Sequence, residues 1–469
     1  MGARCSHCVV WLLSPSWAQT LGFHKASLFS CTPCSPCLPT VGVPLRRRAD
    51  AGSDRRPRSS QSSQFSTNLT EVAVEVLVTG IGLMSALGDL DKSWHRLLAG
   101  ESGLQFAQPF PEFPPRPLGT IESQPMAFLT LVDRVVDAAL HDAGLTAPLP
   151  DCGVVIGSSR SQQHRWEYLH TLFRDRESSN LFPSEENWDW LNSLPHMGAI
   201  ATARKIGATG SVLAPMAACA TGIWALARGF ELIQTGVCDR VIAGAVETPI
   251  TPLTLAGFDK MGALARTGSY PFDRYREGLA LGEGAAVFIL ESAQLARRRD
   301  AKIYGRVLGF GLTADGHHVC ATEPGGKSAI VAVKQCLDRS GITPEDIDYI
   351  HAHGTSTPLN DRSEAHLIGQ LFPWGIPVSS TKGATGHTVG ASGALGTAFC
   401  LKAIDTQTLP PCVGLKDPEF DLDFVRVARL AQVRHLLCFS FGFGGQNAVM
   451  ALGIDRGCDR LGKNHERFG

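Results

Sequence analysis

A cysteine, two histidines and a lysine stand in short stretches rich in glycine, threonine and serine. The cysteine, Cys219, belongs to residues 215–222 (Pro-Met-Ala-Ala-Cys-Ala-Thr-Gly). The apolar residues 210–214 before it predict a short buried strand, and apolar positions at three- and four-residue steps after it predict a helix that ends near Gly236. At a helix N-terminus, free backbone N–H groups and the helix dipole favour a thiolate. Cys219 is therefore a candidate nucleophile that can be acylated, and a buried structural cysteine is the alternative.

The two histidines and the lysine follow other predicted strands. His353 opens residues 353–358 (His-Gly-Thr-Ser-Thr-Pro), and residues 382–387 begin with Lys382 and end with His387. A cysteine nucleophile needs a positively polarised setting and a partner for its proton. In a further stretch, residues 442–447 (Gly-Phe-Gly-Gly-Gln-Asn), the glycines around Phe443 allow backbone N–H groups to point at a developing oxyanion. Together these stretches form a candidate site for acyl transfer.

The elements that must position these residues alternate between buried strands and helices, which indicates an α/β protein. An irregular loop is expected over residues 105–118, and residues 162–190 have no clear pattern. The predicted strands are 72–79, 152–157, 241–244, 285–290, 347–351, 378–380 and 436–440, and the predicted helices are 131–143, 329–338 and 390–398.

Composition excludes several classes of protein. The 469 residues are 44% hydrophobic and 19% charged, which supports a sizeable core. A formal net charge of −1 disfavours a nucleic-acid binder, and no apolar run is long enough to predict a membrane span. Of the 14 cysteines, those after residue 150 are scattered singly in apolar surroundings, as expected for free thiols in a reducing compartment.

Residues 1–70 differ from the rest of the chain. They are basic, rich in Ser, Thr and Pro and poor in acidic residues, which is the composition of an organellar transit peptide. An upstream stretch translated from a misplaced start codon would have the same composition. Cys5 and Cys8, and Cys34 and Cys37, have zinc-ligand spacing, but Pro36 and the lack of a supporting fold argue against a metal site. We expect this extension not to contribute to the fold.

The motifs around Cys219, His353, His387 and Phe443 resemble those of the elongating β-ketoacyl-acyl-carrier-protein synthases of the thiolase superfamily, of the cyanobacterial and plastid type. The resemblance runs from about Val74 to Leu452 and includes residues 270–274 (Tyr-Pro-Phe-Asp-Arg) and 281–284 (Leu-Gly-Glu-Gly). It implies a five-layered αβαβα fold with two pseudo-symmetric halves, residues 71–300 and 301–455, followed by a tail, 456–469. It also implies a homodimer that works with acyl carrier protein.

The resemblance assigns roles to individual residues. Cys219 would accept the acyl group, while His353 and His387 would face the malonyl thioester carbonyl with support from Lys382. The backbone N–H groups of Cys219 and Phe443 would form an oxyanion hole, and the Phe443 ring would gate the acyl pocket. The family's substrate-binding positions correspond to Thr355 and Thr357, in the phosphopantetheine tunnel, and to Phe258. Asp361 and Glu364 also match family positions, as contacts or as structural support. No metal or redox cofactor is implied, because the carrier protein brings the phosphopantetheine.

Four positions depart from the family pattern. Gly396 stands where an acidic residue is usual, and Gln446 where a threonine is usual. Gly262 replaces a basic carrier-protein contact, although Lys260 is close, and Cys320 replaces a hydroxyl residue near the predicted pocket mouth. These departures bear on chain length and on affinity for the carrier.

The expected activity is a decarboxylative Claisen condensation of an acyl-enzyme with malonyl-acyl carrier protein in fatty acid biosynthesis, giving a 3-oxoacyl carrier protein. The expected compartment is a bacterial-type cytoplasm, with the plastid stroma as the alternative if residues 1–70 are a transit peptide. The alternatives for function are a polyketide-type ketosynthase and a cysteine acyl hydrolase or transferase that does not elongate. An initiating synthase pairs one histidine with an asparagine, so His387 argues against it, and a non-catalytic partner subunit would lack Cys219.

Overall fold

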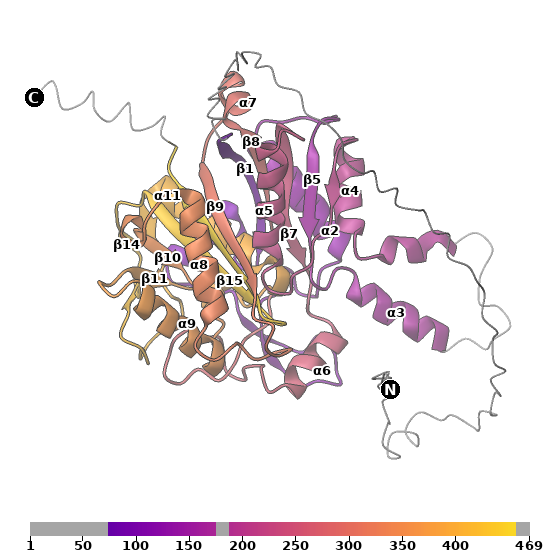
Figure 1. Cartoon of the computed structure of the whole chain (residues 1–469). Coiled ribbons are helices and arrows are strands. Elements are labelled where there is room, and N and C mark those ends of the chain that lie inside the picture. Colours follow the sequence, from indigo (N-terminus) through magenta and orange to yellow (C-terminus); the bar gives the residue numbers. More distant parts are fainter. Residues whose placement is uncertain (1–73, 175–186, 456–469) are drawn as a thin grey trace, which may run out of the picture. The chain divides into compact units, whose positions relative to one another are not determined.

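The computed structural model describes residues 74–174 and 187–455 (Figure 1). The expectations for residues 1–70 and for the tail 456–469 fall outside this part of the chain. Among the described residues, none of the helices has both the length and the apolar character needed to cross a membrane.

Five strands of the N-terminal half lie side by side in the order β1-β8-β7-β5-β6. Their bounds are β1 (Val76–Ser85), β5 (Gly153–Gly157), β6 (Val212–Leu213), β7 (Arg240–Glu247) and β8 (Gly284–Ser292). β8 is antiparallel to β1 and β7, whereas β5 is parallel to β7 and β6.

The C-terminal half repeats this arrangement. Its strands are β9 (Gly305–Ala314), β10 (Tyr349–His351), β11 (Pro377–Ser379), β15 (His435–Gly442) and β16 (Gln446–Gly453). They follow the order β9-β16-β15-β10-β11, with β16 antiparallel to β9 and β15, and with β10 parallel to β15 and β11. The repeated order and direction show that the two halves are pseudo-symmetric, as the family resemblance implies. A short pairing of β1 with β9, over Val76–Val78, joins the two sets of strands.

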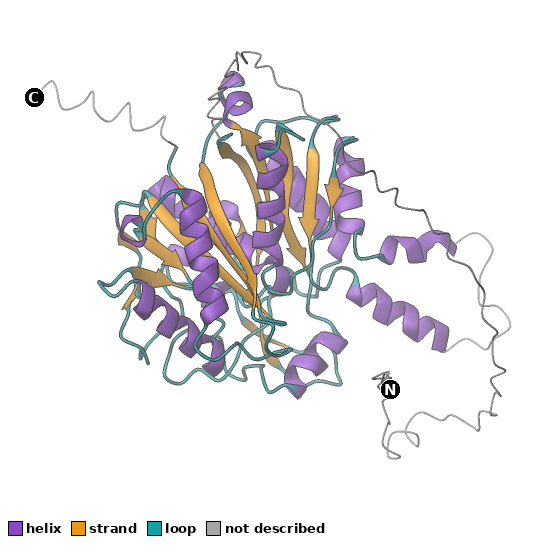
Figure 2. Cartoon of the chain, viewed as in Figure 1, coloured by secondary structure: helices purple, strands orange, loops and turns teal. Residues whose placement is uncertain are grey.

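Helices form three layers around these strands (Figures 1 and 2). Strand residues alternate between the two faces: on β5, Val155 packs with α5, whereas Val154 and Ile156 pack with the outer helices α2 and α4. In the middle layer, α5 and α11 pack against each other, and each of them also contacts strands of both halves. α8 covers β9 and β16 from outside, with α9 beside it. The bounds are α2 (Phe128–Asp142), α4 (Met197–Ile206), α5 (Thr221–Gln234), α8 (Lys327–Ser340), α9 (Pro358–Leu371) and α11 (Ser392–Thr406). The five-layered α/β fold is therefore confirmed.

The remaining elements are short connections. The helices among them are α1 (Leu90–Leu98), α3 (Gln163–Arg174), α6 (Pro252–Lys260), α7 (Ala293–Arg298), α10 (Lys382–Thr385), and the 3₁₀ turns η1 (Asn187–Ser193), η2 (Pro344–Asp346) and η3 (Val389–Ala391). The strands are β2 (Gly88–Asp89), β3 (Gln105–Ala107), β4 (Arg116–Leu118), β12 (Thr408–Leu409), β13 (Asp423–Phe424) and β14 (Arg429–Leu430).

Two local predictions are wrong. The stretch 210–214 is not a buried strand: β6 is the last strand of the sheet, and Leu213 is 39% exposed. Apolar character alone did not distinguish a central strand from an edge strand. The stretch 105–118 is not wholly irregular, because β3 and β4 pair as an antiparallel hairpin.

Candidate active site

The turn that presents Cys219 is tightly held. Cys219 precedes α5 and directly follows Ala218, whose φ of 47° lies in the left-handed region that non-glycine residues rarely adopt. The Thr221 hydroxyl accepts a hydrogen bond from the Ala217 N–H at 2.8 Å and donates one to the Ala218 carbonyl at 2.7 Å. From β15, the Ser440 hydroxyl donates to the Cys219 carbonyl at 2.8 Å. The backbone on both sides of the sulfur is therefore fixed.

Burial has a larger effect on the pKa of the Cys219 thiol than the nearby helix N-terminus has. Removal from water raises the pKa of Cys219 to about 11, although the Lys382 charge, a backbone hydrogen bond from Phe443 and the Arg160 charge each lower it. The sequence predicts that the helix N-terminus favours the Cys219 thiolate, but burial of the side chain favours the thiol instead. At neutral pH Cys219 is a protonated thiol.

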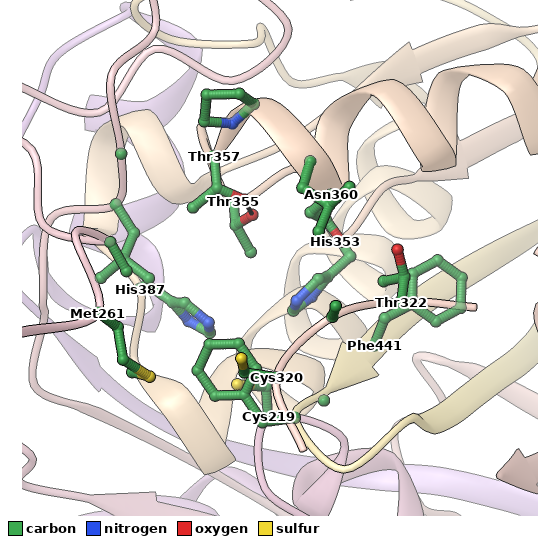
Figure 3. Close-up of a pocket in the computed structure, with 18 of the residues that line it drawn as sticks. Cys219, Met261, Cys320, Thr322, His353, Thr355, Thr357, Asn360, His387 and Phe441 are labelled. Atoms are coloured by element: carbon green, nitrogen blue, oxygen red, sulfur yellow. Dashed lines mark hydrogen bonds between the residues drawn. The ribbon is translucent and has the colours of Figure 1, made fainter. Parts of the chain in front are cut away.

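The structure brings the cysteine and both histidines together. The sulfur of Cys219 and one ring nitrogen each of His353 and His387 all lie within 4.8 Å of one another, and all three side chains are buried. The two imidazole rings meet edge to face, with 5.4 Å between their centroids. Figure 3 shows both rings pointing into the same space beside Cys219. The grouping predicted from three separate motifs is thus present in the fold.

Both imidazoles are neutral. Burial, reinforced by the positive charge of Lys382, lowers the pKa of His353 and of His387 well below the usual range. In His387, Nδ1 accepts a hydrogen bond from the Val389 N–H at 3.2 Å and lies 2.8 Å from the Ser392 hydroxyl. Because Nδ1 is an acceptor, the proton of His387 belongs on Nε2, where it can be donated. In His353, Nδ1 is buried and has no hydrogen-bond partner.

Lys382 acts on His353 from behind the cavity. Its ammonium group donates to the His353 carbonyl, and burial lowers the pKa of Lys382. On the other side of the same residue, the Glu364 carboxylate accepts from the N–H groups of His353 and Gly354, at 2.6 and 2.7 Å. Burial raises the pKa of Glu364 to about 7. Two opposite charges therefore position the His353 peptide, and Glu364 is structural support.

Asp361 supports the neighbouring loop in the same way. Its carboxylate accepts from the N–H groups of Phe272, at 2.8 Å, and Ser356, at 3.2 Å, and pairs with Arg276. Burial raises the pKa of Asp361 to about 6. Like Glu364, it holds backbone rather than facing the cavity.

The glycine-rich loop after β15 packs closely against the backbone of Cys219. A Cβ added at Gly442 would lie 2.9 Å from the Ala217 oxygen and 3.0 Å from the Cys219 nitrogen, so only glycine permits this approach. The next residue, Phe443, lines the cavity, and its ring lies 5.9 Å from that of Phe258. Phe258 itself is fully buried behind Phe443 and does not line the cavity.

A cavity of about 340 Å³ leads to the cysteine. Thr355 and Thr357 line it, with their hydroxyl oxygens 2.8 Å apart, and Figure 3 shows them across the cavity from Cys219. Met261 and Leu359, both half exposed, also line it. The cavity therefore connects the two threonines with the buried sulfur of Cys219.

The four residues that depart from the family pattern lie in different parts of the structure. At Gly396, a Cβ would lie 2.8 Å from the His351 ring, so the imidazole of His351 occupies the space that a side chain at 396 would need. Gly262 and Cys320 are exposed and line the cavity, whereas Gln446 begins β16. Lys260, at the end of α6, is exposed.

Within residues 74–174 and 187–455, two groups of side chains hold possible metal-ligand atoms that lie within 4.8 Å of one another. One is the trio of Cys219, His353 and His387. The other consists of His351, Cys400 and Cys438, buried between α11 and the strands β10 and β15. Cysteine sulfur with imidazole nitrogen is a zinc-type donor set, and each group supplies three such donors.

Sequence reasoning missed several supporting residues. Ser392, beside His387, and Ser440, beside Cys219, are isolated serines with no motif of their own. Asn447 donates to the Asp315 carboxylate at 2.7 Å and so links the glycine-rich loop to the segment after β9. The only sequence signal for this link is that Asn447 ends the Phe443 motif.

Comparisons with known proteins identify the family of this chain. The sequence profile of the β-ketoacyl synthase N-terminal domain matches residues 105–296, and that of the C-terminal domain matches residues 304–416. The chain is 34% identical over 407 residues to 3-oxoacyl-[acyl-carrier-protein] synthase 2 of Synechocystis sp., covering 80% of this chain and 97% of the relative. It is 32% identical over 409 residues to the synthase 2 of Staphylococcus aureus, with 80% and 97% covered.

Solved structures show the same fold. A ketosynthase in complex with the acyl-carrier protein of a type II polyketide synthase, bound to a hexaketide, has a TM-score of 0.77 at 26% identity and covers 82% of this chain and 100% of its own. A β-ketoacyl synthase from Burkholderia phymatum has a TM-score of 0.74 at 25% identity, with the same coverage. With its fold, its cysteine-histidine site and these relatives, the chain belongs to the β-ketoacyl synthase family.

Proposed function

We propose that this protein is a 3-oxoacyl-acyl-carrier-protein synthase that elongates acyl chains in fatty acid biosynthesis. The observation that supports this most is the meeting of one buried thiol with two neutral imidazoles at the end of a cavity lined by two threonines. A cysteine hydrolase needs only one histidine, whereas a decarboxylating condensing enzyme has use for two hydrogen-bond donors. The relatives at 32–34% identity carry this name.

The first half-reaction loads the enzyme. The sulfur of Cys219 attacks the thioester carbonyl of an acyl carrier protein, the carrier thiol leaves, and the thiol proton passes to the departing sulfur through His353, whose Nδ1 has no other hydrogen-bond partner among the described residues. The backbone N–H groups of Cys219 and Phe443 stabilise the oxyanion. The product is an acyl-cysteine that faces the imidazoles.

The second half-reaction forms the carbon–carbon bond. Malonyl carrier protein enters past Thr355 and Thr357, and His353 and His387 donate hydrogen bonds to its thioester oxygen. Loss of carbon dioxide leaves an enolate, which attacks the acyl carbonyl and expels the Cys219 thiolate. Protonation of the thiolate restores the enzyme, and the 3-oxoacyl chain leaves on its carrier. This scheme uses no metal or redox cofactor.

The partners and the compartment are part of the proposal. Acyl carrier protein is the macromolecular substrate, supported by the carrier complex of the structural neighbour. A homodimer is supported by β6, an edge strand that ends in the exposed Leu213 and is followed by the exposed Met216, because an open edge is a template for pairing with a second chain. The proposed compartment is a bacterial-type cytoplasm, or the plastid stroma if residues 1–70 direct import.

The experiment separates loading from decarboxylation. Replacing Cys219 by Gln should abolish acyl transfer to the protein and leave carbon dioxide release from malonyl carrier protein measurable. Replacing His353 or His387 by Ala should lower carbon dioxide release by roughly 10²–10³, the usual cost of losing one oxyanion donor, and slow loading less. If His387→Ala blocks loading while releasing carbon dioxide at the wild-type rate, the proposal is wrong and a cysteine hydrolase is favoured.

A polyketide-type ketosynthase is the second candidate, because one solved structure of similar fold is the ketosynthase of a type II polyketide synthase. The two are distinguished by loading Cys219 from carriers that bear a saturated acyl chain or a 3-oxoacyl chain of equal length. A fatty acid enzyme prefers the saturated chain.

A further inference from the structure

Arg160 lies in an unexpected place for a positive charge. It follows β5 in the chain, and its guanidinium carbon lies 5.9 Å from the centroid of the Phe258 ring. That ring packs on Phe443, and both phenylalanines belong to the apolar cluster that contains Cys219. Phe443 lines the cavity but Phe258 and Arg160 do not, so the guanidinium lies outside the cavity lining, next to the Phe258 ring.

The guanidinium has unused hydrogen-bonding capacity. Its Nε is buried and has no hydrogen-bond partner, and Arg160 forms no ion pair with any residue of 74–174 or 187–455. A buried donor without an acceptor is costly, and more so when it is charged. An arginine in this condition is a site that a bound acceptor would complete.

The carboxylates of the same region are committed elsewhere. Glu247 accepts from the hydroxyls of Ser158 and Ser159 and from three N–H groups, those of Ser159, Arg160 and Gly390. Glu167 accepts from Thr251, Gln163 and the Leu253 N–H. Neither carboxylate therefore neutralises the guanidinium through a direct contact.

The charge of Arg160 also reaches the nucleophile. It is one of the groups that lower the pKa of the Cys219 thiol, after Lys382 and the backbone of Phe443. Arg160 and Cys219 thus share one weakly screened environment, separated by aromatic rings. Contacts connect the guanidinium to the Phe258 ring and that ring to Phe443, so an acyl group on Cys219 that displaced the Phe443 ring would extend towards Arg160.

We propose that Arg160 is a specificity-determining residue that selects acyl groups with a carboxylate or another anionic group at the end remote from Cys219. This inference rests on the proposed function, because the ligand is the acyl group carried by Cys219. An alkyl end would leave the buried Nε of Arg160 without an acceptor, whereas a carboxylate would accept charge-assisted hydrogen bonds from the guanidinium. The substrate class is therefore a monothioester of a dicarboxylic acid.

The test compares pairs of acyl carrier proteins of graded length. Each pair consists of an alkyl acyl carrier and its counterpart of equal carbon number that ends in a carboxylate, and acylation of Cys219 is followed by mass spectrometry. At the length that reaches Arg160, we expect the wild-type protein to load the anionic member about 10- to 100-fold faster, as a charged hydrogen bond supplies. Arg160→Met should remove this preference, and Arg160→Lys should retain part of it.

A second arginine provides the matched control. Arg339 lies in the C-terminal half with its guanidinium carbon 5.0 Å from the Phe310 ring, so Arg339→Met removes a similar cation–ring contact away from the site. It should leave the preference unchanged. The thermal midpoint of each variant shows whether that variant folds. If Arg160→Met does not fold, Arg160→Lys still tests the preference.

The outcomes separate this inference from the proposed function. If the wild-type protein loads alkyl chains at least as fast at every length, or if Arg160→Met keeps the anionic preference, the role of Arg160 is overturned. Carbon dioxide release from malonyl carrier protein, measured on the same preparations, tests the function alone. Absence of loading from every carrier together with absence of carbon dioxide release overturns both.

Discussion

The two halves of the molecule have the same strand order but contribute different chemistry. In each half an active-site residue precedes the helix of the middle layer: Cys219 before α5 and His387 before α11. The N-terminal half makes the connection with a single tight turn. The C-terminal half uses a longer connection that contains α10 and η3, and this length makes room for Lys382 as well as His387. The duplicated scaffold thus places Cys219 and His387 on equivalent connections that differ in length.

The halves also differ in how they place charge. The nucleophile is a neutral thiol with its pKa raised by burial, and both imidazoles are neutral. The charges of the C-terminal half, on Lys382 and Glu364, act on the backbone of His353 and lie outside the cavity lining. The cavity end is therefore a neutral, preorganised set of donors, which suits a reaction that develops negative charge on substrate oxygen.

The largest expected effect comes from Glu364. Replacing it by Ala leaves the N–H groups of His353 and Gly354 buried without acceptors. At about 1–3 kcal/mol for each group, the free energy of unfolding should fall by about 2–6 kcal/mol. Urea unfolding measures this loss, and carbon dioxide release should fall more than acyl loading. Glu364→Gln, which retains one carbonyl oxygen, should lie between Ala and wild type. If acyl loading and carbon dioxide release fell equally, the two halves of the molecule would not contribute separately to these two steps.

Gly442 tests the contribution of the glycine-rich loop to the nucleophile. In Gly442→Ala the new Cβ meets the Ala217 oxygen and the Cys219 nitrogen, so the loop must withdraw and carry the Phe443 N–H with it. Loss of one oxyanion donor should slow acyl loading by roughly 10²–10³. Gly369→Ala is the control, because Gly369 is a helical position with open space around it. Loading at the wild-type rate in Gly442→Ala would exclude the Phe443 N–H from the oxyanion hole.

The pKa of the thiol provides the next test. Because burial raises the pKa of Cys219 to about 11, the reactive thiolate fraction is small at neutral pH and grows about tenfold per pH unit below that value. Alkylation by iodoacetamide, in a Cys320→Ser background, should therefore rise about tenfold per unit between roughly pH 7 and pH 9. Lys382→Met removes a charge that lowers this pKa and should slow the reaction. A plateau below pH 8 would show a preformed thiolate and reverse the interpretation of the site.

The smallest effect is expected outside both halves. Residues 1–70 have a composition that cannot bury a core, and the first described strand starts only at Val76. Their deletion should leave the thermal midpoint and the condensation rate unchanged. A lower midpoint in the shortened protein would assign these residues a structural role.

Much of the site was predictable because its motifs are local. Cys219, His353, His387 and Phe443 each lie in a stretch whose neighbours define a turn at the end of a strand, and the order of these stretches along the chain indicated the family. Helix and strand periodicity indicated the α/β class, and the helix after Cys219 ends at Gln234, close to the expected position. The edge position of β6 was not predictable, because it depends on which strand lies beside it rather than on its own residues.

The sequence alone determined which groups are available for chemistry: one thiol, two imidazoles, and glycines that permit close approach. Tertiary structure decided their states. The pKa of Cys219 depends on burial by segments far away in the chain, and the proton of His387 belongs on Nε2 because the Val389 N–H occupies Nδ1. The ring of His351 fills the space at Gly396, and Lys382 reaches a carbonyl rather than the substrate cavity. Local patterns encode turns and residue types, whereas desolvation and hydrogen-bond partners arise only when distant segments pack together.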